Sequence, residues 1–515
     1  MTRQAENRKD VIQRFPVVGV VGAGTMGIGI AEVAAAHGHK VIVHDAQPQA
    51  AMKAKDALAA RLQKRVDKGR ISAHARQEIL NAISLVETLD ELADASLVIE
   101  AVVEDLAIKQ TIFQQLESIC LPDTMLASNT SSLSITAIAA GLKQPSRLIG
   151  MHFFNPAPVM KLVEVIAGMR SDESWLRLAE DVCRAWGKVP VRARSTPGFI
   201  VNRVARPFYG EPLKMLQEQL STPAVIDAVM RESAGFRMGP FQLMDLIGID
   251  VNFAVSRSVF SAFFNDPRYR PSLIQQEMVA AGLLGRKTGR GFYHYTESTP
   301  AEVPYAPGCV QKGTVTIRGN MGLGEPLRGL IRARRCISLM ESKGSGYLLA
   351  GGCAVVLANG QSATARAREH GYKCLVHVDL AHDFASAETI TLAFSERCAK
   401  ASQDSVIGLF QALGKKVLVV PDAPGLIAMR TVVMLINEAA DAVFNGVCSE
   451  ADVDLAMRYG VNYPEGLLAW GEKIGLRHVL QTLEGLQQWF GDDRYRPSPW
   501  LRHQVEAGTA GKPQD

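Results

Sequence analysis

The chain has 515 residues, which is more than one hydrophobic core usually holds and predicts three or four domains. Its 56 basic and 52 acidic side chains leave a net charge of only +4, so the overall balance gives no reason to expect a nucleic-acid or membrane partner. The eight cysteines form no C-x-x-C pair and no zinc-like spacing, so we expect buried or idle thiols, no metal site and a cytoplasmic protein.

The first predicted unit is FPVVGVVGAGTMGIGIAEVAAAHGHKVIVHD, which has the pattern of a strand, a glycine turn, a helix and a second strand. This spacing is typical of a dinucleotide-binding loop, in which the helix N-terminus faces a pyrophosphate. The residues of the loop that would face the cofactor are Gly22, Gly24, Thr25, Met26 and Gly27. The second strand ends at Asp45, whose carboxylate could bind both ribose hydroxyls and would repel a 2′-phosphate, which favours NAD over NADP. The alternative is that Asp45 only caps the next segment.

The segment after Asp45 predicts a long helix and a turn with a strong basic excess. Its charged residues are Lys53, Lys55, Arg61, Lys64, Arg65, Lys68 and Arg70 against Asp56 and Asp67. One interpretation is a solvated helix face, and the other is a surface that receives the phosphorylated part of a ligand.

Two more α/β steps follow. ASLVIEAVVED predicts a strand that runs into a loop with Glu104, and LPDTMLASNTSSLSI predicts a strand that ends in a small polar cluster. Ligands of open α/β sheets bind at the carboxyl ends of the strands, so Asn129 and Ser131 are expected near a nicotinamide. The cluster is also compatible with an ordinary polar turn.

The stretch RLIGMHFFNPAPVMKLVEVI predicts a hairpin with its turn at NPAPV. His152 and Glu164 share their midpoint at Pro158, inside that turn, so they are expected to be cross-strand neighbours. A carboxylate on one ring nitrogen fixes the histidine tautomer and leaves the other nitrogen free for a substrate proton. The pattern therefore predicts a general base and its orienting partner.

Six motifs in this order and spacing resemble the L-3-hydroxyacyl-CoA dehydrogenase family over residues 15 to about 296: GAGTMG, IEAVVED, ASNTSSLSI, MHFFNPAPVMKLVEV, TPGFIVNR and GRKTGRGFY. The resemblance implies that His152 is the catalytic base and Glu164 its partner, with Ser131 and Asn202 contacting the hydroxyl and thioester region of an acyl-CoA substrate. The positions that match residues holding or neighbouring NAD are Asp45, Glu104, Lys109, Asn129, Ser131, Asn155 and Lys287. The basic helix corresponds to the family's coenzyme A arm, but Lys55 and Leu62 do not repeat its usual contact residues, so no contacts there are assigned.

An internal repeat organises the second half of the chain. WGKVPVRARSTPGFIVNRV recurs as LGKKVLVVPDAPGLIAMRTV, and NDPRYRPSL recurs as GDDRYRPSPWL, at an almost constant offset of about 227 residues. The second copy has Met429 where the first has Asn202, so we expect it to be catalytically silent. By resemblance to shorter members that dimerise through one such domain, the two copies are expected to form an intramolecular pseudo-dimer, with further homo-oligomer formation left open.

The region between the copies has the pattern of a shrunken α/β module. Its GNMGLG has the wrong spacing for a dinucleotide loop, so a structural remnant is favoured over a second NAD site. The expected organisation is a flexible tail (1–14), a Rossmann-type NAD-binding domain (15–193), a helical domain (194–296), a degenerate α/β module (297–420), a second helical copy (421–508) and a tail (509–515). Long members of the family with a duplicated tail act on 3-hydroxyadipyl-CoA or 3-hydroxybutyryl-CoA in phenylacetate or fatty-acid breakdown, and the resemblance leaves both acyl chains open.

Three functions compete at this point. The favoured one is NAD-dependent oxidation of an L-3-hydroxyacyl-CoA. The second is a β-hydroxyacid dehydrogenase of the 6-phosphogluconate type, which would use a lysine base in the helical domain and would have no need for a histidine with a facing glutamate. The third is a non-catalytic NAD-binding relative, against which the intact set of Ser131, His152, Glu164 and Asn202 argues.

Overall fold

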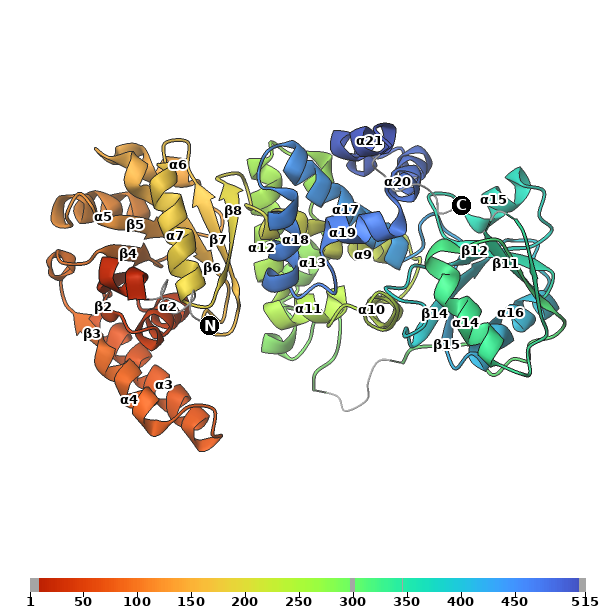
Figure 1. The fold of residues 1–515 in the computed structure, drawn as a ribbon, viewed down its shortest axis with the longest axis horizontal. Coiled ribbons are helices and arrows are strands. Elements are labelled where there is room, and N and C mark those ends of the chain that lie inside the picture. Colours follow the sequence, from red (N-terminus) through yellow and green to blue (C-terminus); the bar gives the residue numbers. More distant parts are fainter. Residues whose placement is uncertain (1–8, 297–301, 345, 509–515) are drawn as a thin grey trace. The chain divides into compact units, whose positions relative to one another are not determined.

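The computed structural model describes residues 9–296, 302–344 and 346–508 and separates into two compact units (Figure 1). The first unit contains residues 1–203 together with 445–461, and the second contains 204–444 together with 462–515. The expected tails at 1–8 and 509–515 lie outside the described residues. Residues 9–14, which we expected to belong to the N-terminal tail, are helical, and Val11 among them is buried in the core of the first unit.

The first unit is built on an eight-stranded sheet in the order β3-β2-β1-β4-β5-β6-β7-β8. All neighbouring strands are parallel except β6 and β7, which form the predicted hairpin. The central strands are buried along their whole length, which explains why they read as continuous apolar runs. The strands are β1 (Val17–Val21), β2 (Lys40–His44), β3 (Ile83–Val86), β4 (Leu97–Glu100), β5 (Met125–Ser128), β6 (Leu148–Phe153), β7 (Leu162–Ala167) and β8 (Val189–Arg194).

Helices alternate with these strands, as the predicted doubly wound fold requires. They are α2 (Thr25–Ala36), α3 (Pro48–Asp67), α4 (Ala73–Ala82), α5 (Leu106–Ile119), α6 (Ile135–Ile138), α7 (Glu173–Ala185) and α8 (Val201–Val204). The pair α3 and α4 projects away from the sheet (Figure 1). One further helix comes from the C-terminal half of the chain: α18 (Glu450–Gly460) packs on β7 and β8, and the Arg194 backbone N–H donates to the carbonyl of Val447 at 2.8 Å. The Rossmann-type fold is therefore confirmed, with one helix added from the second copy.

The second unit holds most of both helical copies. The first copy contributes α9 (Arg206–Gln217), α10 (Pro223–Ala228), the π-helix η4 (Val229–Ser233), α11 (Pro240–Ile247), α12 (Ile249–Ala262), η5 (Pro267–Tyr269), α13 (Leu273–Ala280) and η6 (Arg286–Thr288). The second copy contributes α17 (Ala428–Phe444), α19 (Leu467–Ile474), α20 (Leu476–Phe490), η8 (Asp493–Tyr495) and α21 (Pro499–Glu506).

The two copies pack through equivalent elements within this unit. Helix α9 lies against α17, and η5 lies against η8. The hydrogen bonds repeat across the contact, because Tyr269 donates to Glu438 at 2.6 Å and Tyr495 donates to Glu211 at 2.9 Å. Each of these pairs joins a tyrosine of one copy to the glutamate of the other, which is the pattern of a twofold contact.

A seven-stranded sheet between the copies in sequence forms the expected shrunken α/β module, in the order β10-β9-β11-β12-β13-β14-β15. Its strands are β9 (Val315–Arg318), β10 (Leu339–Ser342), β11 (Tyr347–Ala350), β12 (Cys353–Leu357), β13 (Leu375–Val378), β14 (Thr389–Phe394) and β15 (Lys416–Val419). Its helices are α14 (Glu325–Ala333), α15 (Ala363–Glu369) and α16 (Lys400–Ala412). Parallel and antiparallel pairs are mixed here, unlike the regular parallel order around β1.

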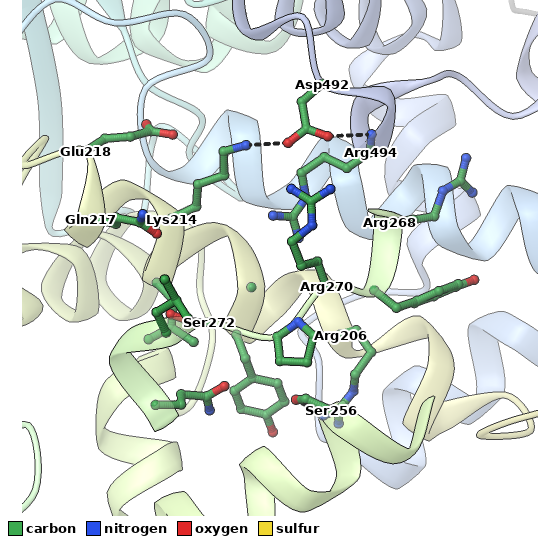
Figure 2. Close-up of a pocket in the computed structure, with 17 residues that line it drawn as sticks. Arg206, Lys214, Gln217, Glu218, Ser256, Arg268, Arg270, Ser272, Asp492 and Arg494 are labelled. Carbon is green, nitrogen blue, oxygen red and sulfur yellow. Dashed lines mark hydrogen bonds and ion pairs between the residues drawn. The ribbon is translucent and has the colours of Figure 1, made fainter. Parts of the chain in front are cut away.

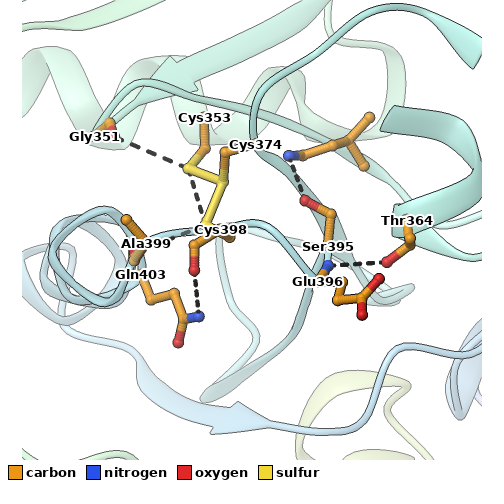
Figure 3. The surroundings of a disulfide bond; sticks show 10 residues. Gly351, Cys353, Thr364, Cys374, Ser395, Glu396, Cys398, Ala399 and Gln403 are labelled. Atoms are coloured by element: carbon orange, nitrogen blue, oxygen red, sulfur yellow. Dashed lines mark hydrogen bonds between the residues drawn. A yellow bond between two sulfur atoms is a disulfide. The ribbon is translucent and has the colours of Figure 1, made fainter. Parts of the chain in front are cut away.

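Three cysteines of the module are buried, as expected for the thiols, but they lie together instead of being scattered. Cys353, Cys374 and Cys398 lie together in its core, with the sulfur of Cys374 within bonding distance of the other two (Figure 3). One sulfur forms one disulfide at a time, so the Cys353–Cys374 and Cys374–Cys398 pairings are alternatives. The three residues are far apart in the sequence, and only the sheet brings them together. Among the described residues, no helix has the length and apolar character needed to cross a membrane.

Candidate active site

The glycine loop between β1 and α2 has the geometry of a dinucleotide-binding turn. Gly22 has a φ of +99°, and a Cβ there would lie 2.7 Å from the carbonyl oxygen of Ala101. A Cβ on Gly27 would lie 1.8 Å from the carbonyl oxygen of Gly22, so only glycine lets the helix approach the strand this closely. The space around Gly24 is open, and α2 starts with no side-chain cap on its first N–H groups. Thr25 and Met26 form the first turn of the helix, so this part of the chain fits a pyrophosphate.

Asp45 follows β2 directly and is tied to the same loop. Its Oδ2 accepts a hydrogen bond from the backbone N–H of Ala23 at 2.7 Å, and its Oδ1 accepts one from Gln47 at 2.9 Å. The second contact spans two residues and lies before α3, whose N-cap is Gln47 and whose first turn has no side-chain cap, so the alternative of a capping role is wrong. The first is a link across 22 residues that fixes the carboxylate beside the glycine turn, so Asp45 borders the cofactor loop.

A buried ionic chain lies at the carboxyl ends of β4 and β5. Lys109 is 1% exposed, and its ammonium lies 2.6 Å from Glu100 and 3.5 Å from Glu104. Oε1 of Glu104 accepts hydrogen bonds from the Thr130 hydroxyl and from the backbone of Ser131. Burial by itself raises the pKa of Glu104, but the hydrogen bonds and the charge of Lys109 outweigh it, so the pKa of this carboxyl is lowered. The buried ammonium of Lys109 is thus committed to two carboxylates of this chain.

Asn129 and Asn155 occupy different settings. The side-chain oxygen of Asn129 accepts a hydrogen bond from the backbone N–H of Phe153 at 2.8 Å, so it joins the end of β5 to the end of β6. Asn155 is exposed in the hairpin turn that follows β6. Lys287 belongs to the other unit, where its ammonium pairs with Asp250 at 2.6 Å.

His152 and Glu164 are directly paired across β6 and β7, as the symmetry of the hairpin predicts. Nδ1 of His152 lies 2.7 Å from Oε2 of Glu164. The histidine is 6% exposed and the glutamate 0%, and the imidazole lies against Phe154 with a ring-centroid distance of 4.5 Å. Water is thus kept from the carboxylate, and only a small part of the histidine is exposed.

The other oxygen of Glu164 holds the start of the helical segment. Its Oε1 accepts hydrogen bonds from the backbone N–H groups of Ile200 at 2.9 Å and Val201 at 3.0 Å. The preceding Phe199 has a φ of +46°, a left-handed conformation that turns the chain into α8. The next residue, Asn202, donates from its side-chain amide to the backbone carbonyl of Ser131 at 3.3 Å. One carboxylate therefore fixes both the imidazole and the segment that carries Asn202.

The second copy repeats the carboxylate that holds the start of a helix, but not its contact with a histidine. Asp379, at the end of β13, accepts hydrogen bonds from the backbone N–H groups of Ile427, Ala428 and Met429 at 2.8 to 3.0 Å. Ile427 and Ala428 are the counterparts of Ile200 and Val201 in the repeat. The carboxylate again anchors the start of a helix, but Met429 stands in place of the asparagine and is completely buried.

The basic helix α3 is partly committed to internal contacts. Arg61 and Arg65 both pair with Glu32, a buried carboxylate of α2, and Lys55 donates to the carbonyl of Ile83 at 2.6 Å. Leu62 is buried in the core. Lys53, Lys64, Lys68 and Arg70 stay exposed, so the choice between a solvated face and a ligand surface concerns these side chains.

The sequence did not reveal three contributors to the site. Glu100 binds Lys109 and accepts a hydrogen bond from Ser128. The sequence feature that could have indicated it is a charged residue at the end of an apolar strand. Nothing in the sequence indicates the left-handed conformation of Phe199, because aromatic residues rarely adopt it. Glu32 sits among alanines on α2, and its partners lie about 30 residues away in the sequence.

These features together define an NAD-dependent dehydrogenase. The family model described as "3-hydroxyacyl-CoA dehydrogenase, NAD binding domain" matches residues 17–196. The model "3-hydroxyacyl-CoA dehydrogenase, C-terminal domain" matches residues 198–295 and again 425–515, and the model "3-hydroxybutyryl-CoA dehydrogenase reduced Rossmann-fold domain" matches 355–424. The chain belongs to the 3-hydroxyacyl-CoA dehydrogenase family.

Individual relatives agree with this assignment. A protein named 3-hydroxyadipyl-CoA dehydrogenase from Escherichia coli K12 is 44% identical over 95% of this chain and 97% of its own length. A crystal structure described as 3-hydroxybutyryl-CoA dehydrogenase from Escherichia coli K12 covers 96% of this chain and 99% of its own, with a TM-score of 0.86 and 42% identity. The human mitochondrial hydroxyacyl-coenzyme A dehydrogenase is 36% identical over 57% of this chain and 95% of its own length.

Proposed function

We propose that this enzyme oxidises an L-3-hydroxyacyl-CoA to the 3-oxoacyl-CoA, with His152 as the general base. The observation that carries the proposal is the 2.7 Å contact between Nδ1 of His152 and the buried carboxylate of Glu164. The names of its relatives favour 3-hydroxyadipyl-CoA or 3-hydroxybutyryl-CoA as the substrate. A cytoplasmic location and a place in phenylacetate or fatty-acid breakdown belong to the same proposal and rest on the composition and the family resemblance.

The chemistry follows from the hydrogen-bond inventory. A carboxylate only accepts hydrogen bonds, so Nδ1 of His152 carries the hydrogen and Nε2 is left to take the proton of the substrate hydroxyl. The charge of Glu164 stabilises the imidazolium that forms. Ser131 and Asn202, which are joined by a hydrogen bond, are the groups proposed to hold the hydroxyl and the thioester carbonyl. When bound, NAD supplies the acceptor for the hydride that leaves C3.

We propose that the cofactor preference comes from Asp45. Its carboxylate is fixed beside the glycine turn by the N–H of Ala23, so it can accept hydrogen bonds from both ribose hydroxyls. A 2′-phosphate at the same place would meet a like charge.

We also propose that the second helical copy replaces the partner subunit of a dimer. The packing of α9 on α17 and the crossed tyrosine–glutamate pairs support this proposal. The counterpart of Asn202 is the buried Met429, which is expected if the second copy keeps its packing role and has no catalytic role.

The test of the catalytic proposal is NADH oxidation with acetoacetyl-CoA, with free acetoacetate and with no acyl substrate. We expect turnover with the thioester alone. His152→Gln should remove nearly all of it while NADH binding, followed by fluorescence, stays within a few-fold of wild type. The proposal fails if this variant turns over like the wild type.

A further inference from the structure

The second unit contains a cavity of about 450 Å³ beside Arg206 (Figure 2). It lies between α9, α12 and the segment from η5 to α13, and Asp492 and Arg494 of the second copy close it. Lys214 of the first copy pairs with Asp492 at 2.8 Å, and Arg270 also lines the wall. The cavity therefore belongs to the contact between the two copies. A second feature of this unit, the cysteine cluster of the α/β module, has no part in that contact or in the proposed dehydrogenase chemistry.

The α/β module brings three cysteines to one end of its sheet. Cys353 begins β12, Cys374 directly precedes β13, and Cys398 follows the end of β14 by four residues. These strands are neighbours, with β13 parallel to β12 and antiparallel to β14. The start of β12, the start of β13 and the end of β14 therefore meet, and the three sulfur atoms lie within 4.8 Å of one another (Figure 3).

The burial and composition of this cluster favour a disulfide over a metal ion. Cys353 is completely buried, and Cys374 and Cys398 are only 7% and 6% exposed. Within the described residues, no histidine or carboxylate joins the three thiols as a fourth ligand. A structural zinc ion takes four protein ligands, and a zinc ion with an open fourth position needs access for water or substrate. A buried group of three thiols meets neither condition.

Cys374 can pair with either of its neighbours without movement of the backbone. Its Cα lies 4.7 Å from that of Cys353 and 4.8 Å from that of Cys398. Both separations fall in the range that disulfides span, about 4.4–6.8 Å. The two pairings close loops of similar length, with sequence separations of 21 and 24 residues, so the entropy of loop closure hardly distinguishes them. Cys374 is therefore the shared member of two alternative disulfides.

The segments that these disulfides join also lead into two helices. Cys398 lies directly before Ala399, the N-cap of α16. Strand β13 runs from the cluster to Asp379, the carboxylate that holds the start of α17. Pairing with Cys353 fixes the start of β13 to β12, and pairing with Cys398 fixes it to the start of α16. Either disulfide thus ties β13 to a neighbouring element of the module.

We propose that Cys353, Cys374 and Cys398 form a site of reversible oxidation that holds one disulfide at a time, with Cys374 as the shared sulfur. The oxidant is a small peroxide, which suits a cluster that is almost closed to solvent, and the reductant is a dithiol. In a reducing compartment such a disulfide forms transiently, in response to an oxidant. The inference does not depend on the proposed catalytic function, because the disulfide acts on the resistance of the module to unfolding.

Oxidation proceeds in two balanced steps, described here for the Cys374–Cys398 pairing. The thiolate of Cys398 attacks one oxygen of the peroxide, which forms an S–O bond, breaks the O–O bond and releases hydroxide that takes up a proton to become water. The sulfur of Cys374 then attacks the resulting sulfenic acid, the S–O bond breaks, and hydroxide leaves with the thiol proton as a second water. Two electrons have passed from the two thiols to the peroxide.

The third thiol allows the disulfide to move within the cluster. The sulfur atoms of Cys353 and Cys398 are 3.4 Å apart. When the thiolate of Cys353 forms a bond to the sulfur of Cys374, the bond between Cys374 and Cys398 breaks, and Cys398 leaves as a thiolate. This exchange needs no further oxidant, so both pairings are expected in one oxidised sample.

The test maps the disulfides of the full chain after treatment with hydrogen peroxide, alkylation in urea and digestion with trypsin. Cleavage after lysine and arginine places the three cysteines in separate peptides, residues 344–366, 374–397 and 398–400. We expect the peptide 374–397 to be linked to each of the other two. A single disulfide uses two of the eight cysteines, so six should be alkylated, and dithiothreitol should restore all eight. Urea unfolding of the oxidised protein should shift to a higher midpoint, because the disulfide restricts the unfolded chain.

Serine variants assign the role of each cysteine. Cys353→Ser should keep the link between the peptides of Cys374 and Cys398, and Cys398→Ser should keep the link to the peptide of Cys353. Cys374→Ser should lose the disulfide, with all of its remaining cysteines open to alkylation after peroxide treatment. The matched control is Cys336→Ser, which removes an exposed cysteine of the same module outside the cluster and should be oxidised like the wild type.

Three results would overturn the proposal. The first is a wild-type chain in which all eight cysteines are still alkylated after excess peroxide. The second is Cys374→Ser protein that forms a disulfide at the wild-type rate. The third is purified protein with one zinc ion per chain, measured by elemental mass spectrometry, that resists peroxide until a chelator removes the ion, since the cluster would then be a metal site. The mapping of the wild type needs no variant, so the first and third results do not depend on whether the serine variants fold.

Discussion

Replacing Glu164 by glutamine tests the central idea that one carboxylate serves both the imidazole and the helical segment. The two carboxylate oxygens accept three hydrogen bonds, one from His152 and two from the backbone N–H groups of Ile200 and Val201. Glutamine has nearly the same shape but offers one acceptor oxygen and one donor nitrogen. If its oxygen keeps the two backbone bonds, its amide nitrogen must face the imidazole.

The magnitudes follow from this geometry. Hydrogen bonds to a charged group are worth about 1 kcal/mol more than neutral ones, so neutralising three of them should lower the free energy of unfolding by about 2–3 kcal/mol. An amide nitrogen facing Nδ1 donates to it and moves the imidazole hydrogen to Nε2, where it blocks uptake of the substrate proton. Loss of the correct tautomer and of general-base catalysis should lower kcat about 10²- to 10⁴-fold.

The assay combines turnover and stability. We would measure kcat with acetoacetyl-CoA and NADH, NADH binding by fluorescence, and urea unfolding of the same preparations. Asp379→Asn is the matched control, because Asp379 anchors a helix through backbone N–H groups in the same way and contacts no catalytic imidazole. It should keep its turnover. If Glu164→Gln also kept a wild-type kcat, Glu164 would be only a helix anchor, and the proposed role beside His152 would be refuted.

Three further predictions follow from the described contacts. Asp45→Ala should weaken NADH binding by about 1.5–3 kcal/mol and reduce the preference for NADH over NADPH, both measured by fluorescence titration. Equal use of NADH and NADPH by the wild type would refute the proposed role of Asp45. Asp227 of α10 is buried and accepts hydrogen bonds from the backbone N–H groups of Phe241 and Gln242. Burial raises its pKa to about 6 from about 3.9 in the unfolded chain, so its contribution to stability is present below about pH 4 and is lost as pH rises through 6. Relative to wild type, Asp227→Asn should gain on the order of 2 kcal/mol between pH 4 and 7 in urea unfolding, and a constant difference would contradict this. Deletion of residues 421–515 should expose apolar faces of α9 and of β7 and β8 and cause aggregation or dimer formation, which light scattering would detect. Met429→Asn should leave the turnover per folded molecule unchanged. A monomeric, fully active truncated chain would contradict the intramolecular-dimer proposal.

Local patterns in the sequence were sufficient for the cofactor loop and for the hairpin that pairs His152 with Glu164. Gly22 and Gly27 are needed by the turn itself, because a side chain at either position would collide with backbone a few ångströms away. The pairing of His152 with Glu164 follows from the length of the turn between them, since a hairpin fixes which residues face each other. The duplication was also visible, because a repeat needs only comparison of the chain with itself.

Contacts between distant segments had to come from the tertiary structure. Lys109 and Glu100 form a buried ion pair, three cysteines of the α/β module meet, and α18 joins the sheet of the first unit. No periodic pattern of residues indicates such contacts, because they depend on how separate elements pack.

The cavity beside Arg206 shows the same division most clearly. The sequence contains Arg206, Arg270 and Lys214 among 56 basic residues, and nothing in their spacing distinguishes them from framework charges. Their roles depend on which carboxylate each one reaches: Lys214 occupies Asp492, and Arg270 is left to line the cavity. Charge compensation acts through space over a few ångströms, so the sequence determined which charges are present, and only the folded chain decided which of them are paired.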